Sequence, residues 1–67
     1  MYKTYEQIIT IHNGTIVEAT DPKFLGSVTE VEEGSELNEL ENGRYKTVVI
    51  LDENDEYVAD VVKEKLV

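Results

Sequence analysis

The chain has 67 residues, of which 40% are hydrophobic and 31% charged, and its formal net charge at pH 7 is −9. A chain of this length forms one domain with a thin core, so we treat residues 1–67 as a single domain. It contains no cysteine and one histidine, which excludes disulfides, thiolate nucleophiles and the common zinc sites, and its acidity disfavours direct binding to nucleic acid or to an anionic membrane.

The first predicted element is a β-hairpin over residues 5–20. Runs of β-branched residues flank the Asn-Gly pair at 13–14, and both residues tolerate the positive φ angles of a type I′ turn. The register stays open at this point. A two-residue loop pairs Ile11 with Ile16, whereas a bulged three-residue loop pairs Ile11 with Thr15.

Residues 21–31 allow two interpretations. Asp21 and Pro22 suit a helix start, as the N-cap and the first helical residue. Glycine, serine and threonine within the segment are poor helix formers, and they favour a strand instead. We prefer a strand that begins near Ser27.

Residues 35–42 predict a short helix. Ser35 can cap its N-terminus, Leu37 and Leu40 fall on one face, and Gly43 can take the left-handed position after the last turn. The alternative is a hairpin turn at Asn42 and Gly43 that leads directly into the next strand.

Residues 45–51 predict the central strand of the sheet. Four apolar residues in succession, Val48 to Leu51, three of them β-branched, are typical of a strand covered on both faces. Turn-forming residues close on both sides leave too little length for a helix.

Residues 52–67 predict a C-terminal helix. Tyr57, Val58, Val61, Val62 and Leu66 fall on one side at helical spacing. Acidic residues in the first turn and lysines in the last also suit the helix dipole. The alternative is a hairpin that turns at Asn54-Asp55, with residues 57–62 as a valine-rich strand.

These elements predict an α+β fold with two layers. We expect a three- or four-stranded, mainly antiparallel sheet with an N-terminal β-hairpin and a C-terminal helix packed on one face. The alternative interpretation of the C-terminal segment gives a small all-β barrel.

Few residues in the chain are suited to catalysis. His12 lies beside the predicted turn, where a solvated surface role is the ordinary one. The four glycines are isolated, so no phosphate-binding loop is present. Residues 52–56 carry five oxygen-bearing side chains but lack the ligand spacing and the distal glutamate of an EF-hand calcium loop. We therefore expect neither an enzyme nor a metal or cofactor site.

The negative charge is concentrated in one segment. Residues 30–56 contain ten acids against Arg44 and Lys46, a net of −8, whereas residues 1–29 contain three acids against two lysines, a net of −1. The predicted partner-binding residues are the ten acids of that segment: Glu30, Glu32, Glu33, Glu36, Glu39, Glu41, Asp52, Glu53, Asp55 and Glu56. Within a helix, Glu36 and Glu39 would stand about 4.5 Å apart along the axis.

This concentration predicts a small acidic inhibitor that occludes a basic, nucleic-acid-handling protein site by mimicking phosphate charge. The composition is similar to that of phage-encoded inhibitors of host nucleases and defence systems as a class. The alternative is a homodimeric structural or interaction module whose acidity serves solubility. Four tyrosines, Tyr2, Tyr5, Tyr45 and Tyr57, are either interface anchors or half-buried sheet residues.

The expected location is the cytoplasm. No apolar run approaches the roughly 18 residues of a membrane span, and residues 1–6 lack the basic-then-apolar layout of a signal peptide.

Overall fold

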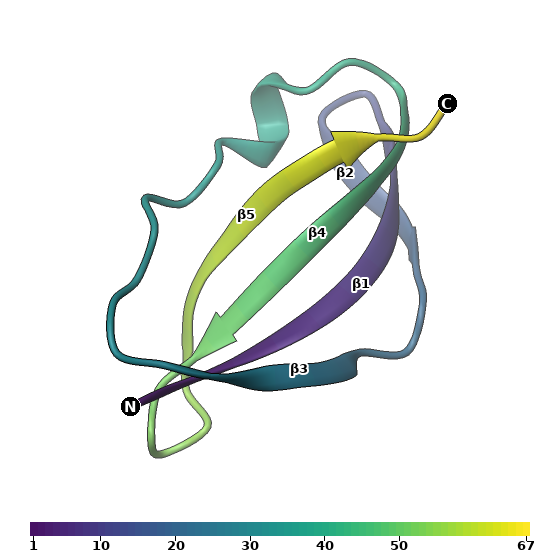
Figure 1. Cartoon of the computed structure of the whole chain (residues 1–67). Helices are drawn as coiled ribbons and strands as arrows, with labels where there is room; N and C mark the ends of the chain where they lie inside the picture. The colour runs from purple at the N-terminus through teal and green to yellow at the C-terminus, as the bar shows by residue number, and fades with distance from the viewer.

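The computed structural model describes all residues, 1–67, and consists of five β-strands and one short 3-10 helix (Figure 1). The strands are β1 (Tyr2–His12), β2 (Thr15–Ala19), β3 (Lys23–Val28), β4 (Gly43–Leu51) and β5 (Tyr57–Lys65), and the 3-10 helix is η1 (Leu37–Glu39). No helix in the structure has the length and apolar character needed to cross a membrane.

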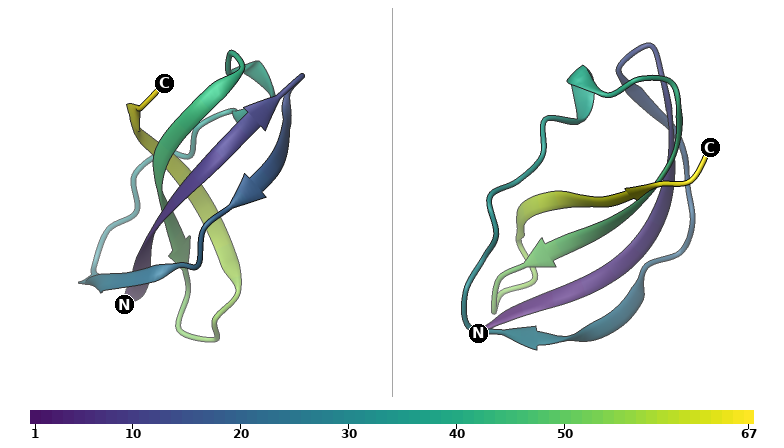
Figure 2. Two further views of the ribbon diagram at one scale, coloured as in Figure 1. Left: turned by 90° about the vertical axis from the view of Figure 1, so that its right-hand side faces the viewer. Right: turned by 45° about the horizontal axis from the view of Figure 1, so that its top comes forward.

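The five strands form one antiparallel sheet in the order β2-β1-β4-β5, with β3 also paired to β1. Strands β2 and β3 share one side of β1: β2 lies beside its C-terminal half and β3 beside its N-terminal half. Figure 2 shows the strong twist of the sheet, which carries β2 and β3 in different directions from β1. Since β2 and β5 end the order and do not pair, the sheet is open.

Two sequence predictions are confirmed. The N-terminal hairpin forms with Asn13 at φ 51° and Gly14 at φ 76°, and Ile11 pairs with Ile16, so the two-residue loop is the correct register. Strand β4 is also central, since it pairs with β1 on one side and with β5 on the other.

The predicted α+β class and its C-terminal helix are wrong, because residues 57–65 form strand β5. The pairing of β5 with β4 shifts register twice, which places extra residues in β5. These β-bulges lengthen the spacing between residues on one face beyond the strand period of two, so the pattern imitates a helix. The alternative prediction, a C-terminal hairpin in a small all-β barrel, is right about the strand and the all-β class but wrong about the barrel, because the five-stranded sheet does not close.

The predictions for the middle of the chain need two further corrections. Strand β3 begins at Lys23, earlier than predicted. The predicted helix over residues 35–42 is reduced to the single turn η1. Ser35 does not cap that turn, because its Oγ accepts a hydrogen bond from the Val62 N–H at 3.0 Å. Gly43 is the first residue of β4 rather than a helix terminus.

The main core lies on one face of the sheet, under η1. Ile9, Ile11 and Tyr45 are at most 4% exposed, and Leu37 and Leu40 of the η1 region pack against them. By register, Ile50 and Val61 are buried on the opposite face. Only 6 of 67 residues are buried, so each core side chain carries a large share of the stability.

Candidate interaction surface

The segment between β3 and β4, residues 29–42, meets the outer edge of β5 at Ser35 and then crosses one face of the sheet as η1 to reach the β1–β2 turn, where the Asn13 N–H donates to Asn42 Oδ1 (Figure 1). We call it the acidic connection. The Ser35 N–H donates to the Asp60 carbonyl oxygen at 2.7 Å, and the Val62 N–H donates to Ser35 Oγ. These two hydrogen bonds hold the acidic connection against the middle of β5.

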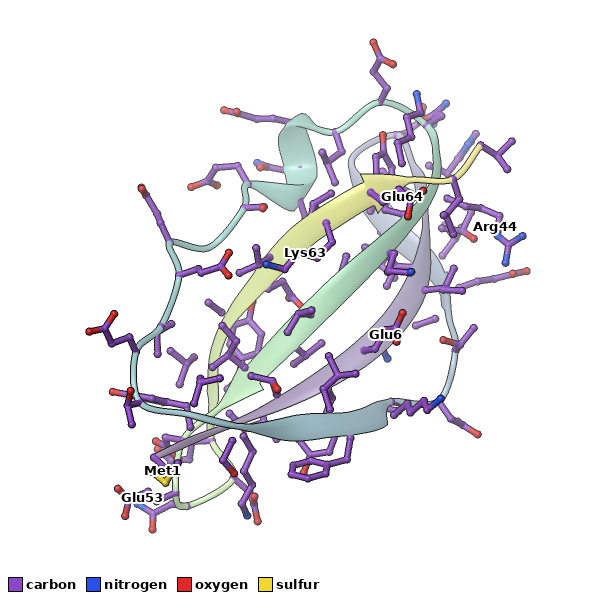
Figure 3. The ribbon with its side chains drawn as sticks, in the orientation of Figure 1. Met1, Glu6, Arg44, Glu53, Lys63 and Glu64 are labelled. Atoms are coloured by element: carbon purple, nitrogen blue, oxygen red, sulfur yellow. The ribbon has the colours of Figure 1, made fainter.

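The acidic connection contains six glutamates and no lysine or arginine, and all six are exposed. Two are ion-paired with lysines of β5: Glu32 with Lys63 at 2.9 Å and Glu41 with Lys65 at 3.0 Å. The other four, which form no ion pair, are Glu30, Glu33, Glu36 and Glu39. Figure 3 shows side chains with carboxylate oxygens projecting outward along this segment.

The β4–β5 turn, residues 52–56, is less available to a partner than its sequence indicates. Asp52 accepts hydrogen bonds from the N–H groups of Asn54 and Glu56, so its carboxylate organises the turn. Glu53 pairs with the N-terminal ammonium at 3.0 Å, and Asp55 pairs with Lys3 at 2.7 Å. Glu56 is the one acid of this turn that is exposed and has no ion pair.

The turn and the beginning of the acidic connection lie at the same end of the molecule as the N-terminus (Figures 1 and 2). The ten predicted residues therefore form an arc that starts at this end, passes β5 at Ser35 and continues through η1 toward the β1–β2 turn. The predicted spacing of Glu36 and Glu39 changes, because three residues of a 3-10 turn rise about 6 Å.

The cations without an ion pair lie away from the acidic connection. Arg44, at the start of β4, projects from the opposite side of the molecule to Lys63 (Figure 3), and Lys23 begins β3. Lys46 contacts Glu6 at 3.4 Å and Glu64 at 3.9 Å on a face of the sheet. The unpaired glutamates of the acidic connection thus have no unpaired cation among them.

No family model, curated protein or solved structure matches this chain. Its function must therefore be argued from the geometry of its own residues.

The tyrosines divide between the two predicted roles. Tyr45 belongs to the core, and its hydroxyl donates to the Glu41 carbonyl oxygen at 2.6 Å. Tyr57 is 64% exposed and donates to Asp60 Oδ2 at 2.7 Å. Tyr57 is thus the tyrosine best placed to contact a partner near the acidic residues.

The sequence analysis did not include the lysines of β5 in the site, although their ion pairs determine which glutamates have no cationic partner. A β-strand reading of residues 57–65 brings Lys63 and Lys65 to the same strand, although the bulge at Lys63 interrupts the regular alternation of faces. That reading alone does not identify Glu32 and Glu41 as their partners, because 31 and 24 residues separate the two pairs in sequence.

The Glu41–Lys65 pair gives a testable pH dependence. The hydrogen bond from Lys65, and next its positive charge, hold the pKa of Glu41 below its ordinary value of 4.5. The pair therefore stabilises the fold fully above pH 4.5, and this contribution is lost as the pH falls through the lowered pKa.

We expect an NMR titration to show the Glu41 carboxyl titrating with a midpoint below 4.5. In Lys65→Gln the midpoint should rise toward the ordinary value, whereas in Lys63→Gln it should stay where it is. A midpoint that does not move in Lys65→Gln would contradict the ion pair.

Proposed function

We propose that the protein binds a basic site on another protein through the acidic connection and thereby blocks nucleic acid from that site. The observation that carries this proposal is the set of exposed glutamates without ion pairs, Glu30, Glu33, Glu36 and Glu39, that the acidic connection presents on either side of Ser35. A groove that has evolved to bind phosphates offers lysines and arginines to these carboxylates.

Several features favour competition over catalysis as the mode of action. The free carboxylates are exposed, and carboxylates that work as an acid and a base need a recess that separates their pKa values. The hydrogen bonds of Ser35 to the backbone of Asp60 and Val62 fix the middle of the acidic connection on β5 before a partner binds. This lowers the entropy cost of association. We place this activity in the cytoplasm, where nucleic-acid-handling enzymes work.

We expect this protein to compete with DNA for binding to one or more members of a panel of purified, basic nucleases and DNA-binding proteins. For a true partner, binding should weaken steeply between about 50 mM and 200 mM salt, and short duplex DNA should displace the protein. Binding that is insensitive to salt, or a complex that still takes up DNA normally, would contradict the proposal.

A pair of charge reversals tests the location of the binding surface. The double variant Glu36→Lys with Glu39→Lys should weaken binding to the basic partner at least about tenfold, because complementary charges at an interface steer association and favour the correct orientation. The matched control, Glu18→Lys with Asp21→Lys, changes the net charge by the same amount at exposed acids outside the acidic connection. Equal weakening by both variants would mean that only the overall charge matters.

A further inference from the structure

The face of the sheet that carries the main core is covered by η1 over part of its length. Ile9 lies opposite Tyr45 on this face, and Leu37 and Leu40 of the η1 region pack against them. Figure 1 shows η1 at the end of the sheet that holds the β1–β2 turn, while β3 crosses the other end. The part of the face beside β3 is therefore left without the cover of η1.

Apolar and aromatic side chains make up this uncovered part. Tyr5 lies between Phe24 of β3 and Val49 of β4, and Leu51 lies opposite Tyr57 of β5. Phe24 is 56% exposed and Tyr57 is 64% exposed. The rings of Tyr5 and Phe24 meet edge-on, with centroids 5.4 Å apart. We call these five residues, Tyr5, Phe24, Val49, Leu51 and Tyr57, the apolar patch.

The apolar patch contains a shallow depression. Its volume is about 400 Å³, and it is lined by Tyr5, Gln7, Pro22, Val49 and Leu51. Sites that bury a drug-sized group typically have volumes of about 300–1,000 Å³. The depression is thus large enough to receive one bulky apolar side chain.

The free charges that border the apolar patch are negative. Asp60 lies on the same face and accepts a hydrogen bond from the Tyr57 hydroxyl at 2.7 Å, and Glu56 directly precedes Tyr57. Neither acid forms an ion pair, whereas Lys3, on this face, is already paired with an aspartate of the β4–β5 turn. The register of β3 with β1 places Lys23 on the other face. The patch therefore favours a partner that carries positive charge beside its apolar groups.

The apolar patch and the glutamates of η1 lie on the same side of the sheet. Glu36 and Glu39 belong to the turn whose leucines pack on this face, and both are exposed. Along β4, Leu51 of the patch is six positions beyond Tyr45 under η1, or about 20 Å. A standard interface buries about 800 Å² of each partner, which is about 30 Å across if round. One partner can therefore cover the glutamates and the patch together.

We propose, building on the function proposed above, that the basic partner also inserts an apolar side chain, flanked by lysines or arginines, into the apolar patch. The apolar side chain fills the depression, and the flanking cations reach Asp60 and Glu56. Such an interface has an apolar centre and a charged rim, and tyrosines at its centre carry much of the binding energy. The glutamates of η1 then speed association, while the patch slows dissociation.

Two peptides with blocked ends, Lys-Lys-Trp-Lys-Lys and Lys-Lys-Gly-Lys-Lys, test the patch by NMR on the full chain. At about 50 mM salt both should shift the amides of Glu36 and Glu39, and only the tryptophan peptide should shift those of Tyr5, Val49 and Leu51. At about 500 mM salt the tryptophan peptide should bind at least about tenfold more tightly than the glycine peptide, because salt screens charge but not apolar contact.

A substitution at the border of the depression tests where the tryptophan binds. Tyr57→Lys places a positive charge beside it and should weaken the tryptophan peptide at least about tenfold. The matched control, Val17→Lys, makes the same change of charge at an exposed apolar residue of β2, 55% exposed, and should leave binding unchanged. Circular dichroism of each variant confirms that it is folded.

The outcomes separate the patch from the function proposed above. A glycine peptide that does not bind the glutamates counts against the proposed function, even if the tryptophan peptide binds the patch. A tryptophan peptide that shifts only the glutamates, or that Tyr57→Lys and Val17→Lys weaken equally, overturns the role of the patch. Sedimentation that shows a dimer of the protein alone, dissociated by Tyr57→Lys, also overturns it, because a second copy then occupies the patch.

Discussion

Replacement of Ile11 by alanine should lower the free energy of unfolding by about 2–5 kcal/mol. Ile11 is 1% exposed and packs with Ile9 and Tyr45 in the main core. A domain of this length is stable by only about 3–10 kcal/mol, at 0.05–0.15 kcal/mol per residue. The loss is therefore a large fraction of the total stability, and urea denaturation followed by circular dichroism should show it as a much lower midpoint for Ile11→Ala.

The control for this effect is Val17→Ala in β2. Val17 is 55% exposed, so its truncation should change the free energy of unfolding by no more than about 0.5 kcal/mol. If both variants lost similar stability, the core would lie elsewhere than under η1.

Replacement of Gly14 by valine should cost about 2–3 kcal/mol. Gly14 has φ 76° in the hairpin turn, and a β-branched residue is strained there. A Cβ at this position would also lie 3.1 Å from the Asn38 carbonyl oxygen in η1. The substitution thus disturbs both the turn and its contact with the acidic connection, which thermal unfolding measures as a lower Tm.

The neighbouring substitution Asn13→Gly is the control for the turn geometry. Asn13 also has a positive φ, 51°, which glycine adopts freely. Its main hydrogen bond, from its own N–H to Asn42 Oδ1 at 2.8 Å, does not involve its side chain. Asn13→Gly should therefore be nearly neutral, and a loss equal to that of Gly14→Val would contradict the assigned turn geometry.

The elements that sequence predicts well are those with strong local signals. The Asn-Gly turn at 13–14 requires two positive φ angles, and few other residue pairs supply them. The apolar run in residues 48–51 favours the middle of a sheet, and β4 lies between β1 and β5, although Ile50 is the one residue of the run that is fully buried. Both signals depend on neighbouring residues only.

The C-terminal strand was misassigned because its periodicity is irregular. On one face of β5 the residues opposite Leu51, Val49, Thr47 and Tyr45 are Tyr57, Asp60, Val62 and Lys65. Their spacings are three, two and three, since a bulge adds a residue at each end. Such bulges are set by pairing with β4, and a local pattern does not reveal them.

The candidate site was predictable as a set of acids but not as a surface. Sequence identified all ten carboxylates. It did not show that Glu32, Glu41, Glu53 and Asp55 are ion-paired, because each partner lies more than 20 residues away. The predicted helix also failed because Ser35 bonds to Val62 rather than to the following turn, a tertiary contact that overrides local capping preference.

The position of Ser35 has a consequence for growth of the sheet. The Ser35 N–H donates to the Asp60 carbonyl oxygen and Ser35 Oγ accepts from the Val62 N–H, so this stretch of the β5 edge has no free backbone groups for a further strand. Natural sheets cover or charge their edges to prevent aggregation. In this protein one segment does both at β5, because the chain that covers the edge also carries Glu33 and Glu36 on either side of Ser35.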